Sequence, residues 1–278
     1  MSYSRQTAQL LSAYRSIRTR RGNAPQWSVR KCENKDEGVI ATIPFVGKDY
    51  ENQAVKILVY ASAENLTNYH GYLDEDAIAE NRHRLFFDAS AEKGDFFFPQ
   101  VHLRPMEDGA LATAAAYVYS KLWGLDPVSP ASFLEKIAFG NVGKFSRRTE
   151  NGREHNIDYA GNISFLKDSM DYVSADLAIL KPDVILMPAT AYQNMKEQMD
   201  ASGAKVLPIY QINVTTVNTL ISRKYPPKNP EELAPTLNDW TQHLAYRFSG
   251  KSREHFLSVF TYLDALMDEA GFLAPPKE

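Results

Sequence analysis

Polar side chains follow short apolar runs at several points in this chain of 278 residues. A carboxylate at such a point can orient water or stabilise a developing positive charge, and amide N–H groups can stabilise developing negative charge. A lysine there can hold a phosphate. The residues of these types that lie at or just beyond the ends of apolar runs are Glu64, Asn65, Asn141, Lys144, Gln211 and Asn213.

The apolar runs themselves predict strands that are buried on both faces, because they are short, continuous and partly β-branched. Stretches of helix formers separate them, and this alternation predicts a parallel sheet covered by helices on both sides. In such a sheet the ligand crevice lies beyond the carboxyl ends of the strands, so the polar residues named above should meet there. The predicted strands are 55–61, 137–141, 183–187 and 206–210, and the predicted helices between them are 108–122, 162–180 and 191–202.

The sequence thus predicts an α/β fold, with three α/β/α layers around a central, mainly parallel sheet of four strands. We expect a single overall domain with a core and two extensions. The core covers 55–225, the N-terminal extension covers 1–54, and the C-terminal helical extension covers 226–278 and packs on the core. Within the extensions we expect a helix at 3–20, a strand at 39–45, and helices near 232–248 and 252–270.

Composition indicates a folded protein that needs no cofactor. Hydrophobic residues make up 44% of the chain and charged residues 23%, which favours a sizeable core over disorder. One cysteine, Cys32, excludes an intrachain disulfide and a multi-cysteine zinc or iron–sulfur site, and the histidines show no paired ligand spacing. No glycine-rich nucleotide-binding loop is present. We therefore expect no cofactor and no metal.

The distribution of apolar residues indicates where in the cell the protein is expected. No apolar run approaches the roughly 20 residues that span a bilayer. The N-terminal residues lack the apolar centre of a signal peptide. We therefore expect a cytoplasmic protein without a membrane partner.

Basic side chains gather in three short stretches, although the formal net charge is −3. Such stretches are typical of a local face that binds nucleic acid, and equally of ordinary solvated charges. The three groups are Arg15, Arg18, Arg20 and Arg21; Lys144, Arg147, Arg148 and Arg153; and Arg223 with Lys224.

Five segments carry a further pattern through their order and their spacing relative to the predicted strands. They are Ala63-Glu64-Asn65, Arg104-Pro105-Met106 with Gly109, Asn141-Val142-Gly143-Lys144, Leu180-Lys181-Pro182-Asp183-Val184-Ile185, and Leu207-Pro208-Ile209-Tyr210-Gln211-Ile212-Asn213. Over residues 55–225 this order resembles the uracil-DNA glycosylase superfamily, most closely its small bacterial and archaeal branches.

The sequence departs from the pattern of that superfamily at four points. The first motif, Ala63-Glu64-Asn65, lacks the family's proline and glycine. Gln211 or Asn213 stands where the family has a histidine, and Met106 stands where an aromatic ring stacks on the base. The iron–sulfur cysteines of those branches are absent.

The resemblance implies an enzyme that hydrolyses the N-glycosidic bond of a flipped-out pyrimidine in DNA and leaves an abasic site. The sugar becomes cation-like while the base leaves as an anion. The substrate would be uracil or a hypermodified cytosine, and the latter would suit a defence against phage. Two alternatives stay open: a catalytically silent protein that binds nucleic acid or nucleotides on the same fold, and an enzyme that acts on a free nucleoside.

The resemblance assigns roles to four residues. Glu64 would orient water, Asn141 would pair with the edge of the pyrimidine, and Gln211 and Asn213 would donate to the leaving base. Each has a simpler interpretation. Glu64 can be a helix N-terminal acid or a surface charge, Asn141 a turn or capping residue, and Gln211 or Asn213 part of a loop or the N-cap of a helix at 214–220.

The remaining assignments concern the base pocket and the phosphates. Met106 is alternatively a core side chain, Arg104 a brace for its loop, and His102 a structural or surface residue. The pocket residues are Asn65, His102, Arg104 and Met106, and the residues for the DNA backbone are Lys144, Arg147 and Arg148.

Overall fold

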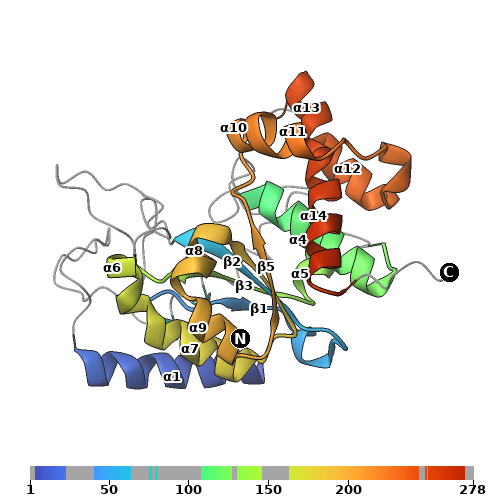
Figure 1. Cartoon of the computed structure of the whole chain (residues 1–278). Helices are drawn as coiled ribbons and strands as arrows, with labels where there is room; N and C mark the ends of the chain where they lie inside the picture. The colour runs from blue at the N-terminus through green and yellow to red at the C-terminus, as the bar shows by residue number, and fades with distance from the viewer. Residues whose placement is uncertain are drawn as a thin grey trace, which may run out of the picture.

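A five-stranded sheet between two layers of helices forms the centre of the molecule (Figure 1). The predicted three-layer α/β/α class is confirmed. The predicted number of four strands is wrong, because a short fifth strand joins the edge of the sheet. The computed structural model describes residues 4–22, 41–63, 75–76, 79–80, 108–126, 130–145, 163–243, 248 and 250–272.

The sheet has the strand order β1-β3-β2-β4-β5, in which β2, β3, β4 and β5 run parallel and β1 runs antiparallel to β3. The four parallel strands agree closely with the predicted ones. The cores of β2, β3 and β4 are buried on both faces, as their apolar sequences require, whereas buried and partly exposed residues alternate along the edge strand β5. The strands are β1 (Phe45–Val46), β2 (Ile57–Ala63), β3 (Ala138–Gly143), β4 (Val184–Pro188) and β5 (Lys205–Ile209).

Strand β1 is much shorter than the range 39–45 predicted for it, since within the described residues only Phe45 and Val46 pair with β3. Pro44 precedes them and has no backbone N–H to donate to the ladder. It also packs closely on Gly140 of β3, where an added Cβ would lie 3.1 Å from the Pro44 Cβ. Pro44 therefore packs on β3, and the chain pairs with β3 only from Phe45 onward.

The connections of the sheet diverge between β2 and β4. From β2 the chain crosses to β3 on one side, and from β4 it crosses to β5 on the other side. Neighbouring strands with opposite connections mark a switch point, and ligands of such sheets bind beyond the carboxyl ends there. The topology thus directs attention to the exits of β2 and β4 and of the strands beside them.

One helical layer contains α4 (Asp108–Trp123), α12 (Pro235–His243) and α14 (Ser258–Glu269). Helix α4 packs on β2 and against both other helices. Many of its buried side chains are small, so the helix can pack closely on its neighbours. The fully buried alanines are Ala110, Ala112, Ala114, Ala115 and Ala116.

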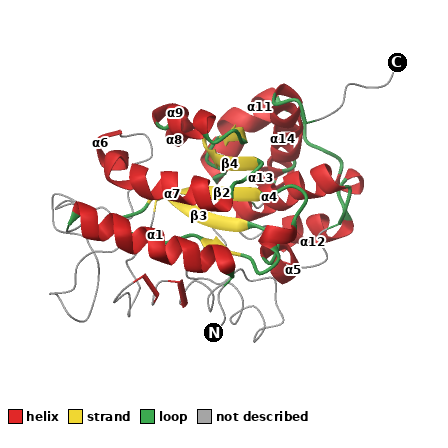
Figure 2. Cartoon of the chain, turned by 90° about the horizontal axis from the view of Figure 1, so that it is seen from below, coloured by secondary structure: helices red, strands yellow, loops and turns green. Residues whose placement is uncertain are grey.

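The opposite layer contains α1 (Arg5–Arg21), α7 (Met170–Leu180), α8 (Ala189–Asn194) and α9 (Lys196–Ala201). Helices α1 and α7 pack side by side in front of the sheet in Figure 2. Helix α1 confirms the prediction at 3–20. It begins at Ser4, whose hydroxyl accepts from the Thr7 N–H at 3.2 Å, and ends at Gly22, which has φ +80°.

Several short helical elements connect or extend these helices and strands. The helices predicted at 162–180, 191–202 and 252–270 are each divided into shorter pieces, and a π-helical segment follows β5. No helix among the described residues is long and apolar enough to cross a membrane. The short elements are η1 (Tyr50–Asn52), α5 (Pro130–Leu134), α6 (Ile163–Leu166), η3 (Lys167–Ser169), α10 (Val214–Thr216), η4 (Val217–Ile221), α11 (Ser222–Lys224), η5 (Pro230–Glu232) and α13 (Lys251–Phe256).

Candidate functional site

The exits of β2 and β3 lie next to each other at the carboxyl edge of the sheet. Ala61 pairs with Asn141, and Ala63, the last residue of β2, pairs with Gly143. Glu64 follows Ala63 in the sequence and lies outside the described residues. The structure therefore brings Asn141 to the edge predicted for the site, beside the strand that leads into Glu64.

The register of the strands also shows which face of the sheet Asn141 occupies. Tyr60 reaches Asp176 of α7, so its side chain lies on the α1 and α7 side of the sheet. Successive residues of a strand alternate between faces, and paired residues of parallel strands share a face. Asn141 and its partner Ala61 therefore face the α4 layer. Asn141 is half-buried there, and the side chain of its neighbour on β2, Ala61, is a single methyl group.

Gln211 and Asn213, which follow β5, have different environments in the structure. Gln211 is exposed. Asn213 is the N-cap of α10, where its Oδ1 accepts from the backbone N–H of Thr216 at 2.8 Å. The N-cap interpretation of Asn213 is thus confirmed. The exposed amide after β5 is that of Gln211.

Lys144 does not lie where a phosphate ligand must lie. Its side chain is fully buried, and its Nζ is 2.6 Å from Oδ2 of Asp176, which is fully buried as well. The prediction that Lys144 holds DNA phosphates is wrong. The Asp176 carboxylate stabilises the buried Lys144 ammonium, since separating the two would leave an unpaired charge in the interior.

Two tyrosines complete this buried cluster, which consists of Tyr14, Tyr60, Lys144 and Asp176. The Tyr14 hydroxyl donates to Asp176 Oδ1 at 2.9 Å, and the Tyr60 hydroxyl donates to Asp176 Oδ2 at 2.8 Å. The Lys144 amine also lies 5.2 Å from the ring centroid of Tyr60 and 5.8 Å from that of Tyr14. The cluster therefore joins α1, β2, the exit of β3 and α7 through charged and polar groups.

Burial governs the ionisation of this cluster. It raises the pKa of the Asp176 carboxyl above its ordinary value, and the Lys144 ammonium and the two hydroxyl groups act in the opposite direction. Burial likewise raises the pKa of Tyr60 well above its ordinary value, and the nearby carboxylate of Asp176 adds to the effect. Tyr60 therefore keeps its proton at neutral pH and donates a hydrogen bond to Asp176.

Backbone contacts fix the exit of β3 further. The Lys144 N–H donates to the hydroxyl of buried Ser169 at 2.9 Å. The Lys144 carbonyl accepts from the Thr42 N–H at 3.0 Å and from the Thr42 hydroxyl at 3.2 Å. Asn141 lies three residues before Lys144, near the end of β3. The buried cluster and these hydrogen bonds therefore hold the backbone that carries Asn141 in place.

An aromatic stack at the exit of β5 was not predicted from the sequence. The rings of Tyr210 and Tyr262 lie nearly parallel, with centroids 5.4 Å apart and 13° between the planes. The Tyr262 hydroxyl accepts from the Tyr210 N–H at 3.1 Å and donates to the Pro208 carbonyl at 3.4 Å. Tyr210 is the last residue of an apolar run, so the sequence indicated a buried strand end instead of an exposed ring.

The helices beyond the stack are joined by a second polar network. Asn218 of η4 donates through Nδ2 to the Ser252 hydroxyl at 2.9 Å, and its Oδ1 lies 2.9 Å from Nδ1 of His255. Since an amide oxygen only accepts, Nδ1 of His255 carries the proton. This network attaches α13 to the π-helical segment.

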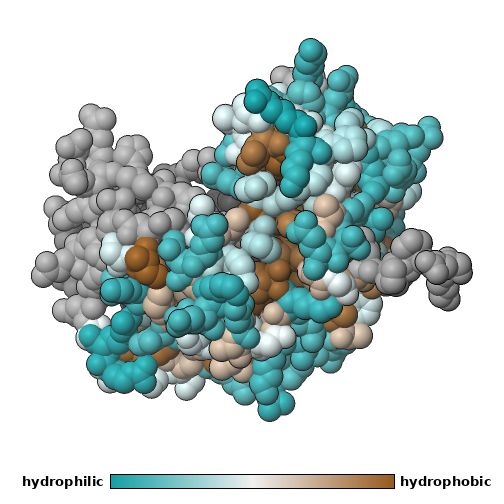
Figure 3. Space-filling view, viewed as in Figure 1, coloured by the Kyte–Doolittle hydropathy of each residue, from teal (hydrophilic) through white to brown (hydrophobic). Residues whose placement is uncertain are grey.

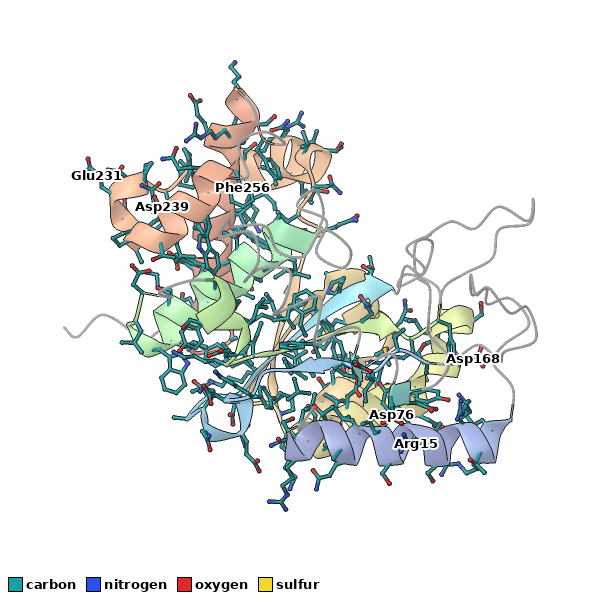
Figure 4. All side chains as sticks on the ribbon, turned by 180° about the vertical axis from the view of Figure 1, so that it is seen from behind. Arg15, Asp76, Asp168, Glu231, Asp239 and Phe256 are labelled. Atoms are coloured by element: carbon teal, nitrogen blue, oxygen red, sulfur yellow. The ribbon has the colours of Figure 1, made fainter. Side chains whose placement is uncertain are left out.

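The three basic stretches differ in the structure. The arginines of α1 are engaged in ion pairs: Arg15 with Asp76 (Figure 4), Arg18 with Glu75 at 3.1 Å, and Arg20 and Arg21 with Asp171 at 3.6 and 3.4 Å. In the second stretch Lys144 is buried. In the third, Arg223 and Lys224 of α11 are exposed. Among the described parts of the three stretches, exposed basic residues close to the carboxyl edge are therefore those after β5.

A surface cavity of about 760 Å³ lies elsewhere, between the end of α7 and α9. Its lining includes Lys181, Asp183 and Gly203, which directly precede β4 and β5. The cavity is thus at the amino edge of the sheet, opposite the strand exits, and contains none of the predicted site residues. Within the described ranges no three His, Cys, Asp or Glu side chains come together as a metal site would require.

Several predicted site residues stay predictions, because they lie outside the described residues. They are Glu64, Asn65, His102, Arg104, Met106, Arg147 and Arg148.

No protein-family model matches the chain, and no curated protein is significantly similar to it.

Proposed function

We propose that the protein is a DNA glycosylase that hydrolyses the N-glycosidic bond of a flipped-out, modified pyrimidine and leaves an abasic site. The observation that carries the proposal is the position of Asn141. It projects from the carboxyl end of β3, half-buried, beside the end of β2 and next to the switch point of the sheet. This is where a parallel sheet of this kind binds its ligand.

The side chain of Asn141 suits recognition of a pyrimidine. Its amide offers one acceptor and two donors, which can pair with the edge of a base. Its partner on the neighbouring strand is Ala61, whose side chain is a single methyl group. A base that has left the duplex must be read along this pairing edge.

The remaining chemistry requires a carboxylate and a donor. In the proposed reaction Glu64, the residue after β2, orients a water molecule whose oxygen forms the new bond to C1′. As the water oxygen bonds to C1′, the water gives a proton to the Glu64 carboxylate. The C1′–N bond breaks, and the base leaves with the electron pair and takes up a proton from solvent. Gln211 supplies an uncharged donor to the departing base, which fits its exposed amide after β5.

An abasic-site assay tests this proposal. Labelled oligonucleotides containing uracil, 5-hydroxymethylcytosine or glucosylated 5-hydroxymethylcytosine are incubated with the protein and then treated with alkali, which cleaves at abasic sites. We expect strand cleavage with at least one of these bases. Intact strands with all of them, and with DNA from phages that carry hypermodified cytosines, would contradict the proposal.

Two substitutions test the assigned residues. We expect Glu64→Gln to slow base release about 10²- to 10⁴-fold, and Asn141→Asp to slow it about 10²- to 10³-fold. Matched controls lie at the amino side of the sheet, where exposed Glu197→Gln and exposed Asn52→Asp should leave the rate within about twofold. Equal losses in the variants and their controls would remove Glu64 and Asn141 from the mechanism.

One observation favours a second candidate, a protein that binds nucleic acid or nucleotides on the same fold without cleaving them. Asn213, one of the two residues that could take the place of the family's histidine, uses its side-chain oxygen to cap α10. This candidate predicts salt-sensitive DNA binding by the wild type with no abasic sites on any substrate.

A further inference from the structure

The residue after β5 presents an aromatic ring on a fixed support. Tyr210 is 41% exposed, although one face of its ring lies flat against Tyr262, which is only 3% exposed. Two hydrogen bonds of the Tyr262 hydroxyl connect it to the backbone at Tyr210 and Pro208, and Tyr225 packs against the same ring at 5.1 Å. The supporting ring is therefore held in place, and the other face of Tyr210 is available.

Basic and apolar side chains border this ring. Lys224 forms a side-chain hydrogen bond with Tyr225, and its amine lies 5.1 Å from the ring centroid of Tyr225. Tyr225 packs on the same Tyr262 ring that supports Tyr210. Arg223 is exposed beside it. Leu220, which is 45% exposed, precedes these two residues by three and four positions and so shares a helix surface with them. Figure 3 shows a hydrophobic patch over the α10 and α11 region, bordered by hydrophilic side chains.

We propose that this surface, the Tyr210 platform (Tyr210, Leu220, Arg223 and Lys224), binds single-stranded DNA by stacking an unpaired base on Tyr210. The inference deepens the proposed function and, in its choice of DNA, rests on it. Aromatic rings with nearby cations are the common means of holding single strands, since every base has a stacking face and every nucleotide a phosphate. In a duplex both faces of a base are covered by its neighbours, so a fixed ring can accept a base only from an unpaired strand.

The position of the platform fits a strand that also reaches Asn141. Tyr210 directly follows the end of β5, and Asn141 lies three strands away in the order β5, β4, β2, β3. Adjacent strands are about 4.8 Å apart, which places the two roughly 14 Å apart along the carboxyl edge. A few nucleotides of an extended single strand span this distance.

Fluorescence anisotropy with labelled oligothymidylate, and with a duplex of the same length, tests the proposal. We expect Tyr210→Ala to weaken oligothymidylate binding about 10-fold, while Tyr210→Phe stays within about twofold of wild type. The change in duplex affinity should stay below about twofold. Leu125→Ala is the surface control, because Leu125 is 52% exposed beyond the far end of α4 and should leave both affinities unchanged.

Charge variants should act in opposite directions. Lys224→Gln should weaken oligothymidylate binding, and Glu269→Gln should strengthen it, because exposed Glu269 acts electrostatically on Lys224 and would repel a phosphate. The proposal would be overturned if Tyr210→Ala bound oligothymidylate as tightly as wild type does. It would also be overturned if the variant lost as much affinity for the duplex as for oligothymidylate.

The assay separates this proposal from the proposed function. If no modified base is released but Tyr210→Ala still binds oligothymidylate about 10-fold more weakly, the glycosylase proposal fails and the platform stands. If wild type forms abasic sites in single strands and Tyr210→Ala does so with unchanged kcat/KM, the platform fails and the glycosylase proposal stands.

Discussion

Two places at the carboxyl edge of the sheet combine tyrosine rings with a lysine, and they differ in their exposure to water. At the exit of β3, Lys144 lies fully buried between Tyr14 and Tyr60 and is paired with Asp176. Beyond the exit of β5, Lys224 lies exposed over the ring of Tyr225, which packs with Tyr210 on Tyr262. Similar residue types thus form a structural cluster in one place and an accessible surface in the other.

The difference follows from the cost of burying charge. An ammonium group in the interior is tolerated only with a partner of opposite charge and further hydrogen bonds, and Asp176 with its two tyrosine donors supplies both. Lys224 remains hydrated, so its charge stays available to a ligand. A lysine near the end of a strand therefore indicates phosphate binding only where no buried carboxylate lies within its reach.

The largest effect we predict comes from breaking the buried pair. Lys144→Ala leaves the Asp176 carboxylate without its cation in the interior, which should lower the free energy of unfolding by about 3–5 kcal/mol in urea denaturation. The exposed pair of Lys196 and Asp200 gives the matched control, and Lys196→Ala should change the free energy of unfolding far less than Lys144→Ala does.

A paired replacement sharpens the same prediction. Lys144→Met combined with Asp176→Leu removes both charges together and should recover most of the stability that Lys144→Ala loses. A double variant as unstable as Lys144→Ala would show that the loss comes from packing and not from the unpaired charge.

The next effect concerns pH. Tyr60→Phe removes a hydrogen bond to Asp176 and should cost about 1–2 kcal/mol near pH 7. The pKa of Tyr60 is raised on folding, so its contribution to stability is present below the unfolded value near 10 and is lost as the pH rises above it. The free energy of unfolding of the wild type should therefore fall faster above pH 10 than that of Tyr60→Phe, by up to about 1.4 kcal/mol per pH unit. Urea denaturation at pH 9, 10 and 11 measures this difference, and parallel profiles would contradict it.

The smallest effect on stability is expected at the Tyr210 platform. Tyr210→Ala should cost less than about 1 kcal/mol, because the ring is substantially exposed. Tyr262→Ala, on the buried side of the same stack, should cost about 3–5 kcal/mol. Thermal unfolding of the two variants gives the comparison, and equal losses would mean that Tyr210 serves the core and not a ligand.

The sequence predicts the parts of this fold that depend on local patterns. The four parallel strands could be predicted because each is a short apolar run, and the cap formed by Asn213 because its hydrogen bond reaches only three residues along the chain. Strand β1 could not be bounded, since its two-residue length depends on how Pro44 packs on Gly140.

The misassignment of Lys144 has a similar cause. Its partner Asp176 lies 32 residues later in the sequence, and Tyr14 belongs to α1, more than a hundred residues earlier. No local spacing around Lys144 indicates such a pair. Tyr210 was missed because an apolar run does not show which of its residues stays at the surface.

Salt dependence of DNA binding tests the contrast between the two lysines most directly. Oligothymidylate affinity would be measured from low to moderate salt for wild type, for Lys224→Gln, and for Lys144→Met with Asp176→Leu. We predict that Lys224→Gln reduces the slope of log Kd against log salt by about 0.7, the value of one lost phosphate contact, and that the double variant keeps the wild-type slope. A reduced slope in the folded double variant, with an unchanged slope in Lys224→Gln, would contradict the account.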